Sequence, residues 1–242
     1  MYNPIEVIKM EQTLKITNVL ADPTRYSIYD YIVKKHGPVT VQEIADQFSI
    51  HPNVARLHLS KLEDIKMIVS ENLKTGKGGR PSRVYRLSDE VIELSFPFRD
   101  YRLLAKIAIE TMLSLGKDGE EALYTTGKQY GKEIIEKQLA KFGTTKENLT
   151  FEQKIQILRS TMNMLGFYPD IYVREDNETF FFEVYNCPFR ELAEEHTSIT
   201  CTMHMHFING LLEGLFDDFQ LKNLRTMFDG CQSCAYNVLA AR

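Results

Sequence analysis

The feature that most restricts the fold of this chain is a close succession of helix signals before residue 66. Asp22-Pro23 is typical of a helix start, because Asp caps unpaired N–H groups and Pro fits the first helical position. Thr40 with Glu43 three residues later predicts a capping box and a short helix after it. A further helix is expected over residues 52–65. These signals follow an apolar helical pattern, so they predict several short helices packed in sequence order.

The helix expected at residues 52–65 has two kinds of surface. Its apolar positions, which we expect to face the core, are Val54, Leu57, Leu59 and Leu62. Its outward positions carry polar groups that suit base edges and phosphates, and they are His51, Asn53, Arg56, His58, Ser60 and Lys61. Arg can bond a guanine edge and Asn an adenine edge. Lys61 is expected to contact a phosphate, which positions a protein on DNA without specifying the sequence.

Two short strands are predicted after this helix, at residues 67–69 and 84–87. The loop that joins them is rich in glycine and basic residues, with Lys74, Lys77, Arg80, Ser82 and Arg83 as candidate DNA contacts. Helix, helix, short turn, helix and a two-stranded hairpin is the order of a winged helix-turn-helix. In that fold the last helix enters the major groove, and an arginine on the hairpin can enter a minor groove. We therefore expect double-stranded DNA as the partner; the alternative is a surface hairpin without a ligand.

The distribution of charge along the chain agrees with DNA binding better than the net charge does. The net charge is −4, but residues 1–90 hold 13 Lys and Arg against 11 Asp and Glu, whereas the remainder holds 16 against 22. Between His51 and Arg86 eight basic residues face only three acidic ones. A basic stripe on an acidic protein favours contact with a polyanion. The alternative is an ordinary solvated face.

Three stretches carry a resemblance to a known family. They are LADPTRYSIYDYI, VTVQEIADQFSIHPNVARLHLSKLEDIKMI and GRPSRVYRL, and together they cover roughly Leu14 to Leu87. This region resembles the ArsR/DeoR-like winged helix-turn-helix regulators. The resemblance implies a homodimer that reads a palindromic operator, with DNA contacts at His51, Asn53, Arg56, His58, Arg80 and Arg83. The first 186 residues contain no cysteine, so the sensor site that metal-sensing members carry in this domain is not expected.

The whole chain predicts an α+β fold in three parts. Residues 1–90 are expected to form the winged helix-turn-helix DNA-binding domain, residues 91–145 a helical linker and dimerisation segment, and residues 146–242 an α+β sensor domain. The middle part has an apolar stripe that suits packing on its own chain or on a second copy. The last part predicts, in order, a helix at 151–165, a hairpin of strands 167–173 and 179–185, helices at 189–195 and 198–216, and a strand pair around Cys231 and Cys234.

All four cysteines lie in the last part of the chain, at Cys187, Cys201, Cys231 and Cys234. A Cys-x-x-Cys pair supplies two metal ligands from one turn, and the other two thiols must come from elsewhere in the fold. We expect Cys187 to begin a helix and Cys201 to open the next one, and helix starts favour thiolates. Alternatives are a thiol–disulfide switch at Cys231-Cys234 and simple burial of the cysteines. His204 and His206 are weaker ligand candidates.

The segment YNCPFRELAEEH, Cys201, INGLLEGL and GCQSC resembles the C-terminal sensor region of regulators related to the Suf-operon repressor, over about residues 180–236. The resemblance implies an iron–sulfur cluster held by cysteines. Cys187 and Cys201 match the group, whereas the tight Cys231-Cys234 spacing departs from it. Zinc is the alternative metal, since four thiolates suit both.

Several function classes are set aside by what the sequence lacks. No apolar run of membrane-spanning length and no secretory signal is present, so a cytoplasmic protein without membrane contact is expected. No thioredoxin-like βαβ pattern surrounds the Cys-x-x-Cys pair, and no enzyme activity is expected. A remaining alternative is a regulator with a structural zinc and a small-molecule effector pocket, lined by Phe180, Phe181, Phe182 and Tyr185. Those aromatic residues suit an ordinary core better.

Overall fold

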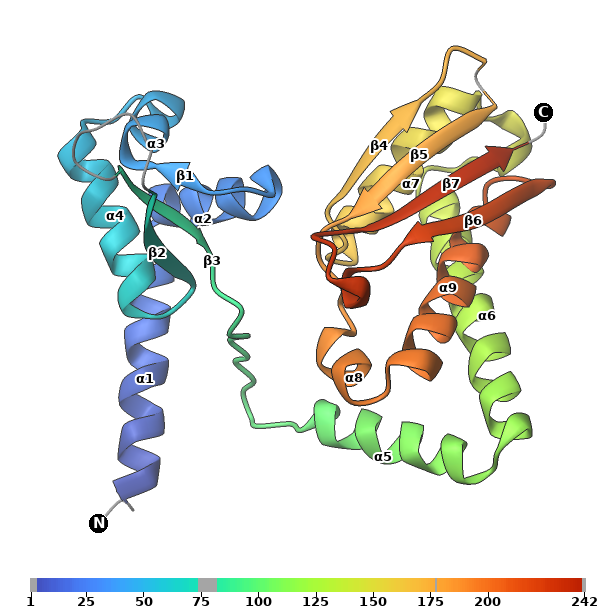
Figure 1. Ribbon diagram of the computed structural model, residues 1–242, viewed down its shortest axis with the longest axis horizontal. Coiled ribbons are helices and arrows are strands. Elements are labelled where there is room, and N and C mark those ends of the chain that lie inside the picture. Colours follow the sequence, from blue (N-terminus) through green and yellow to red (C-terminus); the bar gives the residue numbers. More distant parts are fainter. Residues whose placement is uncertain (1–3, 74–81, 177, 241–242) are drawn as a thin grey trace. The chain divides into compact units, whose positions relative to one another are not determined.

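The computed structural model describes residues 4–73, 82–176 and 178–240, without the side chains of residues 4–9 and Ser82 (Figure 1). The chain divides into two compact units, Met1–Arg99 and Asp100–Arg242. Helices and antiparallel sheets occur in both units, so the predicted α+β class is confirmed. None of the described helices has the length and apolar character needed to cross a membrane.

The first unit is built from short helices and a small sheet. Its helices are α1 (Pro4–Leu20), α2 (Pro23–Lys35), α3 (Val41–Phe48) and α4 (Pro52–Asp64). Its strands are β1 (Val39–Thr40), β2 (Ile68–Leu73) and β3 (Ser82–Leu87), in the order β1-β3-β2, with every pair antiparallel. This is the predicted helix-turn-helix followed by a wing of β2 and β3.

The predicted helix signals act as caps in the first unit. The Asp22 carboxylate accepts the Arg25 N–H at 3.0 Å, with Pro23 in the first turn of α2. The Thr40 hydroxyl accepts the Glu43 N–H at 3.1 Å. A capping box also predicts a hydrogen bond from the Thr40 N–H to the Glu43 side chain. Here the Glu43 carboxylate instead accepts a hydrogen bond from the Tyr31 hydroxyl at 2.9 Å and pairs with Lys35. This ties α3 to α2.

The second unit packs helices against a four-stranded antiparallel sheet of order β4-β5-β7-β6. The strands are β4 (Pro169–Val173), β5 (Thr179–Val184), β6 (Phe219–Arg225) and β7 (Cys234–Ala240). The helices are α5 (Tyr101–Ser114), α6 (Lys117–Lys141), α7 (Phe151–Met164), α8 (Arg190–Glu195) and α9 (Thr197–Glu213), with short 3-10 turns at Lys146–Asn148 and Met227–Asp229. Residues 91–145, predicted as a linker and dimerisation segment, thus contribute α5 and α6 to this unit.

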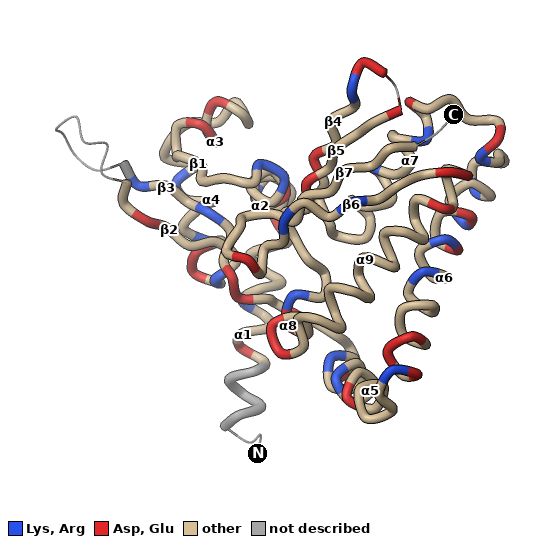
Figure 2. Tube along the Cα trace, turned by 45° about the vertical axis from the view of Figure 1, so that its right-hand side comes forward, with Lys and Arg blue, Asp and Glu red and all other residues tan. Residues whose placement is uncertain are grey.

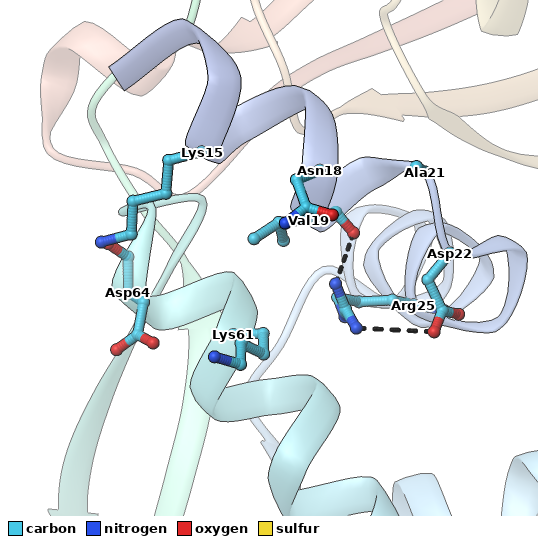
Figure 3. A pocket seen from close by; sticks show the side chains of 8 residues that line it. All are labelled: Lys15, Asn18, Val19, Ala21, Asp22, Arg25, Lys61 and Asp64. Carbon is cyan, nitrogen blue, oxygen red and sulfur yellow. Dashed lines mark hydrogen bonds and ion pairs between the residues drawn. The ribbon is translucent and has the colours of Figure 1, made fainter. Parts of the chain in front are cut away.

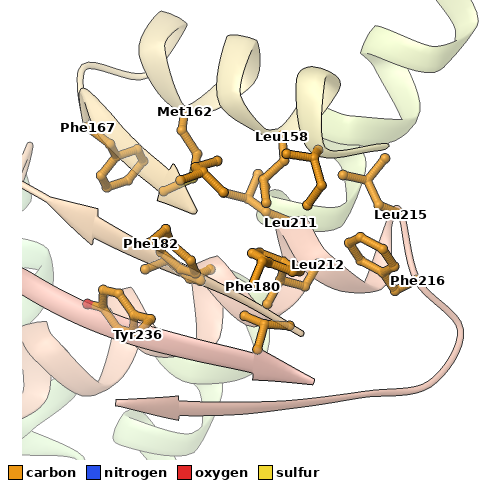
Figure 4. Close-up of a cluster of buried hydrophobic side chains, with 14 of the residues drawn as sticks. Leu158, Met162, Phe167, Phe180, Phe182, Leu211, Leu212, Leu215, Phe216 and Tyr236 are labelled. Atoms are coloured by element: carbon orange, nitrogen blue, oxygen red, sulfur yellow. The ribbon is translucent and has the colours of Figure 1, made fainter. Parts of the chain in front are cut away.

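One face of the sheet forms the core of the second unit. Alternate residues of β5 and β7, among them Phe180, Phe182 and Tyr236, pack against Leu158 of α7 and Leu211 of α9 (Figure 4). The period of two along each strand explains this selection, since successive side chains point to opposite faces. Burial of large aromatic and aliphatic groups on this face supplies the main driving force for the unit.

The α6 and α9 backbones cross at very short range. A Cβ atom added to Gly210 would meet the Lys128 carbonyl oxygen at 1.9 Å, and one added to Gly131 would meet the Phe207 carbonyl oxygen at 2.1 Å. Only glycine leaves room for this approach. The crossing fixes α9, which carries Cys201, against the longest helix of the unit.

Candidate nucleic-acid interface

The start of α4 is an ordered polar surface. His51 is the N-cap, and its Nδ1 accepts the Asn53 N–H at 3.2 Å. The Arg56 guanidinium donates to the Asn53 side-chain oxygen at 3.2 Å. His51, Asn53 and Arg56 are all exposed. Two side chains that can read base edges therefore lie side by side, one turn into the helix.

His58 does not share this surface, so the prediction that it faces outward is wrong. The residue is 8% exposed, and its Nδ1 lies 4.0 Å from the Asp22 carboxylate. Burial lowers the pKa of His58, against the opposing effect of Asp22. The cause is the phase of α4, which buries Ala55, His58, Leu59 and Leu62. These positions follow the i, i+3, i+4, i+7 spacing of one helix face.

The same phase exposes two apolar residues that were predicted to face the core. Val54 is 41% exposed and Leu57 is 55% exposed. Apolar side chains on a recognition helix can contact the methyl group of thymine. Val54 and Leu57 are therefore candidate DNA contacts that sequence reasoning missed. The helical spacing of Ala55, Leu59 and Leu62 was the sequence signal that these three residues form the buried face, which leaves Val54 and Leu57 exposed.

The wing connects to α4 through Arg83. Its guanidinium donates to the Glu63 carboxylate at 2.7 Å and to the Ser70 hydroxyl at 3.0 Å, and it lies over the Tyr85 ring. Arg83 is exposed but engaged within the unit, so it orients the wing on α4. Lys74, Lys77 and Arg80, and the Ser82 side chain, lie outside the described residues.

Figure 2 shows Lys and Arg interspersed with Asp and Glu along α4, β2 and β3, and the other cations of the predicted basic stripe differ in their ion pairs. Lys66 pairs with Glu90, and Arg86 with Asp89. Lys61 is exposed on α4, and it forms no such ion pair with any of the residues that the structure describes. Arg56 and Lys61 are thus the cations of α4 that remain available to a phosphate or a base.

The cysteines of the second unit sit in three different elements. Cys187 is buried in the loop between β5 and α8, which begins at Arg190, so the expectation that Cys187 begins a helix is wrong. Cys201 lies beyond the first turn of α9, which begins at Thr197, so the expectation that it opens the helix is wrong. Cys231 precedes β7, and Cys234 begins that strand and is buried. All four are free thiols.

Three of these thiols influence one another. The pKa of Cys187 is raised to about 12, chiefly by burial and to a smaller extent by Cys234 and Cys201. Burial also raises the pKa of Cys201 and of Cys234. The sulfur of Cys187 accepts the Phe189 N–H, and that of Cys234 accepts the Met227 N–H at 3.4 Å. These donors favour a charged sulfur, in opposition to burial.

In this structure the four thiols are not arranged as the ligands of one metal site. Within the ranges that the structure describes, no three His, Cys, Asp or Glu side chains are grouped so as to hold a metal ion. His204 is buried against the rings of Phe167 and Phe189, whereas His206 stacks on Tyr124. The sequence-predicted ligands Cys187, Cys201 and Cys234 are electrostatically coupled, and Cys231 is coupled to Cys234.

The aromatic residues considered for an effector pocket divide between the two faces of the sheet. Phe180 and Phe182 are fully buried in the core. Phe181 lies on the opposite face beneath the Arg174 guanidinium, and the Tyr185 hydroxyl donates to Glu183 at 2.5 Å. Phe180 and Phe182 are therefore core residues, as expected.

Comparison with known proteins supports the N-terminal assignment. Residues 20–71 match a sequence family described as a helix-turn-helix domain. This range contains α2, α3, α4 and the start of the wing. The chain thus carries an N-terminal helix-turn-helix domain. No curated protein matches the sequence.

Solved structures show weak likenesses to this chain. One is a homodimeric winged helix-turn-helix DNA-binding domain from Mycobacterium bovis, a possible ArsR-family regulator, at 18% identity over 36% of this chain and 73% of that one, with a TM-score of 0.31. Another is a trafficking protein particle complex subunit 3 from Naegleria fowleri bound covalently to palmitic acid, at 15% identity over 58% and 94%, with a TM-score of 0.43. A third is the phenol-responsive sensory domain of the activator PoxR, at 14% identity over 76% and 89%, with a TM-score of 0.42.

Proposed function

We propose that the chain is a sequence-specific transcription regulator of the ArsR/DeoR-like type, which binds a palindromic operator as a homodimer. The observation that carries this proposal is the exposed start of α4, within the helix-turn-helix segment, where Asn53 and Arg56 lie side by side. Bidentate contacts from such side chains each discriminate between bases by about 1–3 kcal/mol. The wing, oriented through Arg83, would add contacts to the adjoining backbone.

Substitution of Arg56 tests this assignment. An operator is first selected from random duplexes with the full chain, and affinities are then measured by fluorescence anisotropy. We expect Arg56→Ala to weaken the selected operator far more than random DNA, because it removes a base contact. Lys77→Ala should weaken both and reduce the salt dependence of binding. If both variants bind the selected operator like the parent, the contact surface lies elsewhere.

We further propose that Cys187, Cys201, Cys231 and Cys234 bind an iron–sulfur cluster, or a metal ion such as zinc, and that this modulates operator binding. Thiolate chemistry suits either group. Burial raises the pKa of Cys187 and Cys234, but the N–H donors to their sulfurs would stabilise thiolates if a metal or cluster were bound. A bound group would supply a link between the loop before α8, α9 and the start of β7. Ligation requires the thiols to draw closer than they lie in this structure.

Metal analysis and a visible spectrum of protein purified without oxygen test the sensor proposal. Iron with sulfide and visible absorbance is the expected result, and replacement of Cys187 by Ser should abolish it. A colourless protein loaded with zinc would instead indicate a structural metal with a separate effector site. If the protein is free of metal and forms a Cys231–Cys234 disulfide on oxidation, the result would indicate a thiol–disulfide switch and no cluster.

A further inference from the structure

A hollow lies beside α4 in the first unit, on the side that faces α1 (Figure 3). It has a volume of about 450 Å³. Its walls come from α1, from the turn into α2 and from the second half of α4, and the lining residues are Lys15, Asn18, Val19, Ala21, Asp22, Arg25, Lys61 and Asp64. Three cations thus meet two acidic side chains in one concavity.

One of the two acidic groups is already neutralised. The Asp22 carboxylate accepts the Arg25 backbone N–H at 3.0 Å and pairs with the Arg25 guanidinium at 3.4 Å. Asp64 contributes its main chain as well, because its carbonyl oxygen accepts the Lys15 ammonium at 2.8 Å. This bond holds the Lys15 charge at the rim of the hollow. The Asp64 carboxylate remains as an opposing charge.

Arg25 is anchored rather than mobile. Its Nη1 donates to the Val19 carbonyl at 2.7 Å, so the guanidinium is fixed in the wall (Figure 3). Its Nε is buried and has no hydrogen-bond partner among the described residues. A buried donor without a partner is costly, and a ligand or water usually satisfies it. Because Arg25 is paired with Asp22, the positive charge that the hollow presents to a ligand comes from Lys15 and Lys61.

The position of the hollow on α4 indicates what that ligand is. At about 100° per residue, Lys61 and Glu63 project from nearly opposite flanks of the helix. The Glu63 flank holds the wing through Arg83, and the Lys61 flank borders the hollow. The exposed residues Asn53 and Leu57 lie between the two flanks. A helix in the major groove runs between the two phosphate backbones, so each flank faces one strand.

We propose that the hollow seats a backbone phosphate of the DNA strand opposite the wing, with Lys15 and Lys61 as the charged contacts and Asn18 as a neutral donor. This inference rests on the proposed DNA-binding function and extends its contact surface to α1. Asp64 opposes the phosphate and limits its affinity. Charge in the hollow therefore controls the strength of binding without affecting the choice of sequence.

Salt-dependent binding of the full chain to duplex DNA of mixed sequence tests this proposal. We expect Lys15→Ala to make the slope of log affinity against log salt shallower by about one. Asp64→Asn should strengthen binding several-fold, because it removes a repulsive charge and keeps the carbonyl that Lys15 uses. Lys34→Ala is the matched control, since Lys34 is an exposed lysine of α2 that pairs with Asp30 and does not line the hollow.

The possible outcomes separate this inference from the function on which it rests. Equal effects of Lys15→Ala and Lys34→Ala, or no gain from Asp64→Asn, would overturn the phosphate seat while leaving DNA binding intact. A parent chain that binds no duplex at all would overturn both. In the last measurement, inorganic phosphate is added to the protein at matched ionic strength. If it shifts the Asn18 side-chain NMR signals without displacing DNA, the hollow takes a free anion instead. Thermal melting of each variant checks that it is folded.

Discussion

Among single residues, His204 has the clearest consequence for stability. It is 4% exposed, stacks on Phe167 with ring centroids 5.1 Å apart, and its Nε2 has no hydrogen-bond partner among the described residues. Burial lowers the pKa of His204 to about 4 from its ordinary value of 6.5. The folded unit therefore holds this ring neutral at pH values where an unfolded chain would protonate it.

The direction of the pH effect follows from this difference. The unfolded state binds a proton as the pH falls below 6.5 and the folded state does not, so stability is lost between about pH 7 and pH 4. The loss is on the order of 3 kcal/mol, since each pKa unit corresponds to about 1.4 kcal/mol. We expect His204→Phe to flatten the fall in unfolding free energy, as measured by urea denaturation across this range. His206→Phe is the matched control, because that ring is only partly buried, and it should keep the parent profile.

At the scale of secondary-structure elements, local chemistry accounts for most of what the sequence predicted. Asp22 and Thr40 cap α2 and α3 as expected, and the wing strands and the β4–β5 hairpin form near their predicted residues. These features depend on neighbours within a few positions. The expected strand pair near the end also forms, but its first strand is β6, before Cys231. DNA contact by the named residues stays a prediction.

The phase of α4 was the main failure, and it has a physical cause. Val54 and Leu57 are more hydrophobic than Ala55 and His58, so hydrophobicity alone selects the wrong face. In the structure Ala55 is fully buried in the core of the first unit, and His58 is buried beside Asp22. The grouping of the thiols is likewise a tertiary property. Cys187, Cys201 and Cys234 belong to a loop, a helix and a strand that only the fold brings together.

At the scale of the whole molecule, α5 is a helix that exposes several large apolar side chains. Ile109 is buried, but on other sides of the helix Leu104 is 60% exposed and Ile107 is 52% exposed. A helix that is apolar on several faces is usually buried on several faces. Under the proposed function a second copy covers this surface. An isologous contact of α5 with its counterpart would then join two DNA-binding units for two operator half-sites.

Substitution on the exposed face of α5 tests this arrangement. We expect the parent to sediment as a dimer and the double variant Leu104→Glu, Ile107→Lys to sediment as a monomer, because the new charges would have to be buried in the contact. Its melting temperature as a monomer should change little, since both side chains are exposed within the chain. Operator affinity should fall steeply, because two separate monomers no longer bind the two half-sites as one linked unit. Leu239→Lys, at an exposed leucine on the sheet, is the matched control and should remain dimeric. A double variant that stays dimeric and keeps operator affinity would place the interface elsewhere.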